Sequence, residues 1–500
     1  MRCLALLLFS VGWGQRVPLP SYINTPLHES APVLSSDGRL LFFWRLDDPV
    51  GLGAQDIFEA QWEDSLGDLG AARHLGGAIN DARGNIPFGI SPDGQFLLVY
   101  KEFRNPRNPC ELGFSRRVLG DLWSAPVQLR IQNFYSESGS SLTAALGWDG
   151  RTLLLSMRGK ESLGGEDLYV SFYDPDQRLW SEPKHLGPIL NTPKDEITPF
   201  LASDGVTLYF SSNGRPDSKG LDIYMSRRLD DSWQQWSPPQ RLPPPINSEA
   251  DDYYFKFAPL RPEVAYLVSN DSAELWGRQI YRVPLPPAYQ PRPVVLVRGK
   301  VLERSLKRPI PNAEVRYYNL EERRLEGTAL SADSTGEYQM LLPLGGLYGI
   351  VVLSPGYFSI SEQIDLRQGA SKSPLEKDIL VAPIQVGEVI RLNGLFFATG
   401  DSTLSPESYV ELERLAWLLS DRPTMRIEII GHTDNVGALE KNLELSRRRA
   451  RAVARYLTGR GIASERLIVL GKGPLEPIAD NRLAEGRTLN RRVEFRIISP

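Results

Sequence analysis

The stretch Gly431-His432-Thr433-Asp434-Asn435 decides the fold of the carboxy-terminal part of the chain. It follows residues 426–430, Arg-Ile-Glu-Ile-Ile, which alternate charged with apolar residues and so predict a half-buried strand. A helix is predicted over residues 438–457, and it carries Arg449 fifteen residues after Asp434. The pattern therefore predicts a carboxylate on a loop after a strand and an arginine on the helix that follows.

The predicted helix over residues 438–457 buries one apolar face. Its core stripe recurs at helical spacing and consists of Ala450, Val453, Ala454 and Leu457. Most of its arginines therefore point to solvent, namely Arg447, Arg448, Arg451 and Arg455. Arg449 lies at the edge of the stripe, so its alkyl stem can pack while its guanidinium reaches a groove. Strands over 467–470 and 493–498 complete a compact α/β sandwich.

Residues 388–498 resemble the OmpA-like peptidoglycan-binding domain. The residues that carry the resemblance are Gly-His-Thr-Asp-Asn-x-Gly at 431–437, Asn442, Leu445-Ser446, Arg449-Ala450, Tyr456-Leu457, Gly461-Ile462, Arg466-Leu467 and Asn490-Arg491-Arg492-Val493. The resemblance implies that the domain holds diaminopimelate, a residue of the peptidoglycan stem peptide whose free end carries an ammonium and a carboxylate.

The resemblance implies a role for each matching position. Asp434 matches the aspartate that meets the ammonium, and Arg449 matches the arginine that binds the carboxylate as a two-pronged partner. The supporting positions are Asn442, Leu445 and Arg491. The family often has Asp or Asn where this chain has Gly400, so one side-chain contact is missing. Taken singly, Asp434 could be a helix N-terminal residue and Arg449 a solvated arginine, and only their combination favours binding.

A small β-sandwich is predicted over residues 294–366, after a stiff proline-rich linker at 284–293. Its short strands with Gly and Pro turns resemble the carboxypeptidase regulatory-like domain, a transthyretin-like fold that carries no zinc. No His-x-x-Glu and no Gly-x-Ser-x-Gly occurs in the chain. We expect a spacer that sets the distance between its neighbours, and a carbohydrate- or protein-contacting face is the alternative.

Residues 18–285 contain an internal repeat of about 56 residues. Asp-Gly turns at residues 37, 93, 149 and 204 are spaced by 56, 56 and 55 residues, and each precedes an apolar strand. Asparagines keep the same period at Asn24, Asn80, Asn133, Asn191 and Asn247. The units resemble TolB-like β-propeller repeats, and five units predict a closed ring of five blades. An open β-solenoid is the alternative.

The repeat region shows no catalytic or metal-binding pattern. Its histidines, His28, His74 and His185, lie in sequence surroundings that look unrelated and lack metal-ligand spacing. The Asp-Gly aspartates occur in every turn, which indicates a structural role. We therefore expect no catalytic residue, no metal and no cofactor in this region. A peptide or loop that binds over the ring is an alternative, but the sequence indicates no residue that would bind it.

The amino terminus is predicted to be a secretory signal over residues 1–14, with a charge, a short apolar run and small residues. A buried strand or an uncleaved anchor is the alternative. The two cysteines are Cys3, inside that segment, and Cys110, so no internal disulfide is expected. The net charge of -4 argues against nucleic-acid binding, and no later segment is long and apolar enough to cross a membrane.

The order of the three modules resembles that of envelope proteins associated with type IX secretion in Gram-negative bacteria. Such relatives often carry tetratricopeptide helices and a lipid-modified cysteine, which this sequence lacks. The expected function is a non-enzymatic periplasmic scaffold that holds peptidoglycan and presents the propeller to an outer-membrane or secretion-system protein. One alternative is a structural tether between peptidoglycan and the outer membrane without a secretion role. A propeller enzyme acting on the cell wall is the other.

Overall fold

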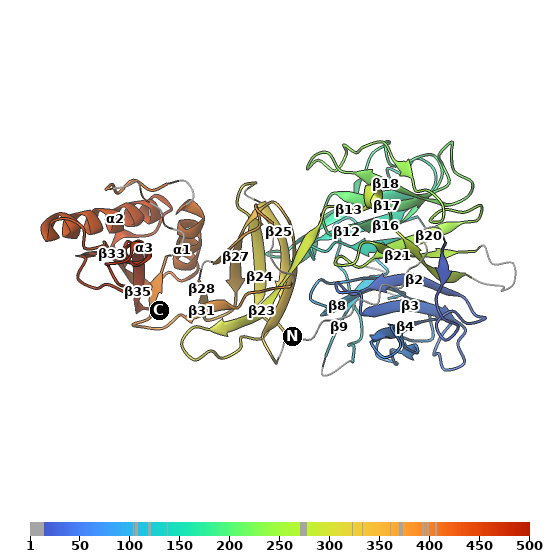
Figure 1. Ribbon diagram of the computed structural model, residues 1–500, viewed down its shortest axis with the longest axis horizontal. Coiled ribbons are helices and arrows are strands. Elements are labelled where there is room, and N and C mark those ends of the chain that lie inside the picture. The colour runs from blue at the N-terminus through green and yellow to red at the C-terminus, as the bar shows by residue number, and fades with distance from the viewer. Residues whose placement is uncertain are drawn as a thin grey trace.

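The computed structural model describes residues 15–500, apart from 104, 106–108, 119–121, 138, 271–277, 323, 333, 361, 370–373, 393–394, 396, 398–399 and 406–407. The signal predicted over residues 1–14 lies outside the described residues. Along the chain, the structure passes from a group of antiparallel sheets through a two-sheet sandwich to an α/β unit (Figure 1). It is mostly β, with few helices.

Five antiparallel sheets of four or five strands occupy the first part of the chain. Their first strands are β2 (Glu29–Leu34), β7 (Asn85–Ile90), β11 (Thr143–Leu146), β16 (Glu196–Leu201) and β20 (Asp252–Phe257). Each first strand contacts the next, and β20 contacts β2. The sheets therefore close on themselves, and we call this part the five-sheet ring.

The other strands follow outward in each sheet. The second and third strands are β3 (Leu40–Leu46) with β4 (Gln55–Glu63), β8 (Phe96–Lys101) with β9 (Leu112–Arg116), β12 (Thr152–Met157) with β13 (Asp167–Asp174), β17 (Thr207–Ser212) with β18 (Asp222–Arg227), and β21 (Val264–Ser269) with β22 (Gln279–Pro284). The outer strands are β5 (Asp68–Leu69), β6 (Arg73–His74), β10 (Val127–Gln128), β14 (Leu179–Trp180), β15 (Lys184–His185) and β19 (Gln240–Arg241). In the last sheet the outer strand is β1 (Val17–Pro18), which pairs with β22 and joins the two ends of the ring.

The Asp-Gly turns join the first and second strands of four sheets. Their glycines have φ between 67° and 72°, a left-handed conformation that glycine adopts without a steric penalty. The aspartate Oδ1 accepts a hydrogen bond from the amide two residues later in all four turns, at 2.9–3.0 Å. These aspartates therefore shape their turns.

Four of the five repeated asparagines make the same contact. Asn191 is buried, and its amide group accepts a hydrogen bond from Leu168 N and donates one to Leu168 O. The other pairs are Asn24 with Ile280, Asn80 with Ile57, and Asn247 with Ile223. Asn133 differs, because it is exposed and donates to Glu182. Each of the four binds a third strand to the segment that leads into the following sheet.

The structure corrects the interpretation of the histidines. His74 and His185 occupy equivalent places, with Nε2 at 3.2 Å from Asp56 Oδ2 and at 2.9 Å from Asp167 Oδ2. Each ring also meets the repeated asparagine of its unit. In the fourth sheet Arg241 pairs with Asp222 in the same way, at 2.6 Å. The two histidines lie 111 residues apart in the sequence, which equals two periods of the repeat. This spacing already indicates that they occupy equivalent positions.

The middle part of the chain is a sandwich of two sheets. One has the order β26 (Glu337–Pro343), β23 (Val294–Glu303), β31 (Ile379–Pro383) and β28 (Tyr357–Ser359), with β30 (Leu375–Glu376) beside β23. The other has the order β25 (Arg324–Leu330), β24 (Glu314–Asn319), β27 (Leu347–Leu353) and β29 (Glu362–Asp365). Strand β31 pairs in parallel with β23, so the sandwich continues past the predicted end at residue 366. Parallel strands are not joined by a tight turn, so no turn residues in the sequence indicate that β31 pairs with β23.

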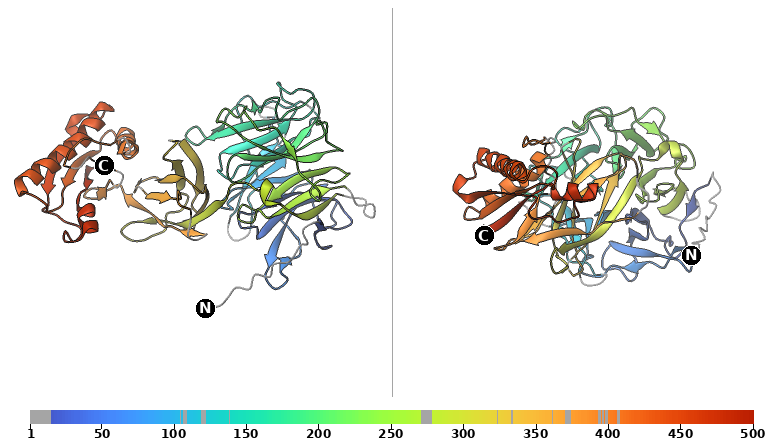
Figure 2. Two further views of the ribbon diagram at one scale, coloured as in Figure 1. Left: turned by 45° about the horizontal axis from the view of Figure 1, so that its top comes forward. Right: turned by 60° about the vertical axis from the view of Figure 1, so that its left-hand side comes forward.

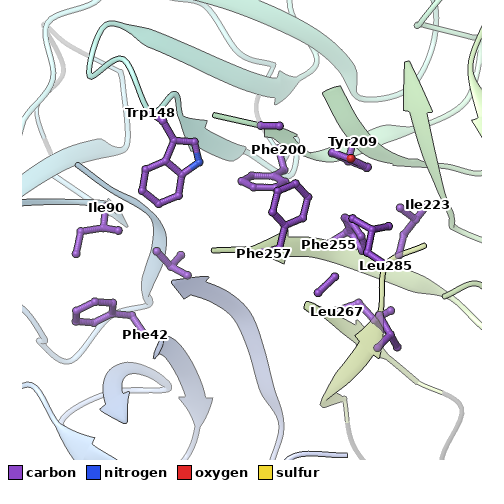
Figure 3. Packing of buried hydrophobic residues seen from close by; sticks show 14 of the residues in the cluster. Phe42, Ile90, Trp148, Phe200, Tyr209, Ile223, Phe255, Phe257, Leu267 and Leu285 are labelled. Carbon is purple, nitrogen blue, oxygen red and sulfur yellow. The ribbon is translucent and has the colours of Figure 1, made fainter. Parts of the chain in front are cut away.

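The sandwich packs directly on the five-sheet ring. Asp93 Oδ2 accepts a hydrogen bond from Leu330 N at 3.0 Å, and Thr328 N donates to Asp149 O at 2.9 Å. Leu341 of the sandwich belongs to the buried cluster at the centre of the ring. Figure 3 shows that cluster, in which Phe200 meets Phe257 edge to face with centroids 4.8 Å apart. The Asp-Gly turns at residues 93 and 149 thus contact the sandwich.

The carboxy-terminal unit is a four-stranded sheet covered by helices. The strand order is β32 (Val389–Arg391), β35 (Val493–Ser499), β33 (Arg426–His432) and β34 (Leu467–Gly473). Helices α1 (Tyr409–Asp421) and α2 (Leu439–Gly459) bury their apolar faces against the sheet, and a short helix α3 (Ala484–Asn490) precedes β35. This unit lies at the end of the molecule away from the five-sheet ring (Figures 1 and 2).

Candidate functional site

Asp434 lies in the loop between β33 and α2, with its side chain only 14% exposed. Its Oδ1 accepts a hydrogen bond from Val436 N at 3.1 Å. Its Oδ2 accepts one from Arg491 Nη1 at 2.8 Å. The carboxylate is therefore oriented by the loop and paired with a cation from a segment 57 residues away.

Arg449 lies on α2 and is 6% exposed. Its Nε donates a hydrogen bond to Asp401 O at 3.0 Å, and its guanidinium covers the Phe397 ring at 5.0 Å from the centroid. Burial lowers the pKa of Arg449, as does the charge of Arg491, while Asp434 and Asp401 raise it. Among the described residues, no hydrogen-bond acceptor meets its two terminal nitrogens. A buried guanidinium with two unused donors is suited to a carboxylate from outside the chain.

Asn442 and Leu445 share the helix face that carries Arg449, because the spacings of three and four residues bring them together. Asn442 is buried, and its Nδ2 donates to Val436 O at 3.1 Å. It thus fixes the loop that carries Asp434. Leu445 is half-buried beside it.

Arg491 follows α3, a helix that the sequence reading did not predict. Besides Asp434, it donates through Nη2 to Thr488 Oγ1 at 2.9 Å, and its side chain is 43% exposed. Asn490 is fully buried and holds the preceding loop through hydrogen bonds with Ile478 N and Ala479 N. The short helix and this loop anchor therefore position Arg491 over Asp434.

His432 belongs to the wall of the site and not to its opening. It is fully buried, with Nε2 at 2.9 Å from Glu494 Oε1, and Arg492 Nη2 lies 3.3 Å from the same oxygen. Burial alone would raise the pKa of Glu494, but the hydrogen bonds from His432 and Arg492 bring it down to about 2. We therefore assign His432 a structural role.

Gly400 has φ of +73°, and a Cβ atom there would meet no atom within 4 Å. The next residue, Asp401, contributes its carbonyl to Arg449, whereas its carboxylate accepts from Ser402 N and Thr403 Oγ1. The main chain at Asp401 thus contacts Arg449, and position 400 offers no side chain.

The structure brings Arg491, Arg449 and Asn442 close to Asp434 or its loop, and Leu445 lies on the same face of α2 as Asn442 and Arg449. Two guanidiniums and one carboxylate suit a ligand that carries both charges. In the part of the chain that the structure describes, no three His, Cys, Asp or Glu side chains converge as a metal site would require.

Comparison with known proteins supports a family for this segment. Residues 396–491 match the OmpA family. The chain is 43% identical over 103 residues to outer membrane protein A of Bordetella avium, covering 21% of this chain and 53% of that protein. It is 43% identical over 99 residues to the peptidoglycan-binding protein ArfA of Mycobacterium tuberculosis, covering 20% of this chain and 30% of that protein.

Part of the chain is also similar to solved structures. One is the peptidoglycan-associated lipoprotein from Burkholderia pseudomallei, at 27% identity and a TM-score of 0.20, covering 21% of this chain and 87% of that one. The chain thus spans from about a third to about half of the curated relatives named above. None of the described helices is both long and apolar enough to cross a membrane.

Proposed function

We propose that the OmpA-like segment binds peptidoglycan through the diaminopimelate of its stem peptide. The observation that carries the proposal is Arg449, a buried guanidinium beside the oriented carboxylate of Asp434, whose two terminal nitrogens meet no acceptor among the described residues. ArfA, one of the similar proteins, is itself a peptidoglycan-binding protein. Peptidoglycan offers a ligand with the required pair of charges.

In the proposed complex, the free carboxylate of diaminopimelate lies against the guanidinium of Arg449 as a bidentate pair. The ammonium approaches Asp434, which in the free protein is neutralised by Arg491 at 2.8 Å. The ligand ammonium therefore competes with Arg491 or shares the carboxylate with it. Asn442 keeps the Asp434 loop in place, and Leu445 contacts the aliphatic stem.

We further propose that the five-sheet ring is a five-bladed β-propeller over residues 18–285, and that residues 294–366 form the main part of a regulatory-like spacer. The cyclic contact of the five first strands supports the propeller. The whole chain is then a periplasmic, non-enzymatic scaffold associated with peptidoglycan and the outer membrane. Its ring presents a surface to an outer-membrane or secretion-system protein.

Sedimentation of the full chain with cell-wall sacculi that contain diaminopimelate tests the binding. We expect the chain to co-sediment, and Asp434→Ala or Arg449→Ala to abolish this, because unpairing one buried charge costs about 2–5 kcal/mol. Asp421→Ala and Arg426→Ala are matched controls, since both residues are exposed and lie away from the site. Unchanged sedimentation of both site variants would refute the assignment.

Two further experiments separate the remaining functions. A crosslinked pull-down from intact envelopes recovers an outer-membrane or secretion-system protein if the ring binds one, and recovers none if the chain is only a tether. Release of soluble fragments from purified cell wall by the full chain would instead support a wall-acting enzyme.

A further inference from the structure

Helix α2 carries a row of cations on its solvent face that the proposed pocket does not use. The row consists of Lys441, Arg448, Arg451 and Arg455, and we call it the basic stripe. All four residues are exposed. Spacings of seven, three and four residues keep them on one side of the helix, over a length of about 21 Å.

Within the part of the chain that the structure describes, the arginines of the basic stripe have no ion-pair partner. Among the described residues, no carboxylate lies within 4.0 Å of Arg448, Arg451 or Arg455. Exposed arginines elsewhere are commonly paired, as Arg298 is with Glu376 at 2.8 Å and Arg482 with Asp480 at 2.8 Å. In a chain with a net charge of -4, this row is therefore a local excess of positive charge, with Glu444 as the one acidic residue between Lys441 and Arg455.

The basic stripe adjoins the proposed pocket. Arg448 precedes Arg449 in the helix, and its charge reaches Asp401, the residue whose carbonyl holds Arg449. Hydrogen bonds from Thr403 and Ser402, with a smaller contribution from Arg448, lower the pKa of the Asp401 carboxyl. A polymer strand seated in the pocket would therefore pass close to the stripe.

The composition of this helix face distinguishes between anionic partners. The exposed residues of α2 include one large apolar side chain, Leu439, at its first position. A helix that lies on a lipid bilayer needs an apolar face to insert. The face instead carries four cations and one carboxylate, Glu444, which suits a hydrated polymer with regularly spaced carboxylates.

We infer that the basic stripe is a second contact surface for the cell-wall polymer, which binds carboxylates of stem peptides next to the one held in the pocket. The inference rests on the proposed function, and it extends recognition from one side chain to the repeating polymer. Each pair of an exposed arginine and a ligand carboxylate attracts weakly, but several such pairs add up along a polyanion. Because salt screens exposed charges, the combined attraction depends strongly on the salt concentration.

The test compares binding to intact sacculi with binding to a single soluble stem peptide. The full chain carrying Arg448→Gln, Arg451→Gln and Arg455→Gln is sedimented with sacculi at increasing salt, and its affinity for a soluble diaminopimelate stem peptide is measured by calorimetry. We expect sacculus affinity at low salt to fall by about tenfold and its salt dependence to flatten. We expect stem-peptide affinity to stay within about twofold, because Arg449 and Asp434 are untouched.

The matched control removes three other exposed arginines, Arg39→Gln, Arg261→Gln and Arg298→Gln, whose side chains are 50%, 53% and 52% exposed. Equal loss of sacculus affinity in the control would overturn the inference, as would an unchanged stripe variant. Binding of the wild-type chain, but not of the stripe variant, to vesicles of anionic phospholipid would assign the stripe to a lipid surface and also overturn it. Failure of the wild-type chain to bind the stem peptide would refute the proposed pocket instead.

Discussion

Single residues in this protein show how burial changes the chemistry of a charged group. Lys256 on β20 is 7% exposed, donates to Pro199 O at 3.2 Å and lies 4.9 Å from the centre of the Phe200 ring. No carboxylate pairs with it among the described residues. Burial lowers the pKa of Lys256 to about 7. Arg449 is also buried, and its pKa is lowered too, although Asp434 and Asp401 offset part of the effect of burial.

Lys256 makes the stability of the ring depend on pH. Between pH 7 and the normal lysine pKa, the unfolded chain binds a proton that the folded chain lacks, so stability rises with pH through that window. We expect Lys256→Met to raise the free energy of unfolding by about 1–3 kcal/mol at pH 7 and to flatten this rise. Denaturant unfolding at pH 6, 8 and 10 measures both effects. Lys300→Met, an exposed site, is the control, and an equal response of the two variants would contradict the prediction.

At the scale of elements, the repeat is held together by side chains that bond to the backbone of a neighbouring strand. Asn191 satisfies both polar groups of Leu168, whereas Asn133, at the corresponding sequence position, makes no such contact. The period of 56 residues predicted hairpins and a ring. It did not show which asparagines bond to which strands, because those partners lie in the preceding sheet or, for Asn24, at the other end of the chain.

The two asparagines provide a paired prediction. Asn191→Ala removes both hydrogen bonds to Leu168 and leaves the buried Leu168 N–H unpaired, whereas Leu168 O keeps its bond from Leu186 N, so the change should lower the free energy of unfolding by about 1–3 kcal/mol. Asn133→Ala should change it by less than about 0.5 kcal/mol, because that side chain is exposed. Thermal unfolding monitored by circular dichroism measures the difference. Equal effects would show that the hydrogen bonds of Asn191 do not stabilise the ring.

At the scale of the whole molecule, the ring and the sandwich share one buried cluster. Leu296 and Leu341 of the sandwich belong to the same cluster as Phe257 of the ring. The proline-rich linker also contacts the ring, because the hydroxyl of Tyr209 donates a hydrogen bond to Tyr289 O. The two parts should behave as one rigid body.

Leu341→Asp tests this coupling, because a buried carboxylate in the shared cluster would separate the two parts. We expect the linker at residues 284–293 to become sensitive to proteolysis and the molecule to lengthen in small-angle scattering. Leu306→Asp, at an exposed leucine of the sandwich, should leave both unchanged. A linker that stays protected in the Leu341 variant would argue against the shared cluster as the joint.

The sequence by itself determined the three-part order, the repeat with its Asp-Gly turns, and the motif that places Asp434 and Arg449 near one another. These features are local, since turns, helix faces and strand alternation depend on residues a few positions apart. Only the tertiary structure decided that β1 completes the last sheet, that β31 belongs to the sandwich, and that Arg491 neutralises Asp434. It also decided that, among the described residues, the terminal nitrogens of Arg449 and the arginines of the basic stripe have no partner. Those facts depend on contacts between segments tens to hundreds of residues apart, for which local sequence carries no pattern.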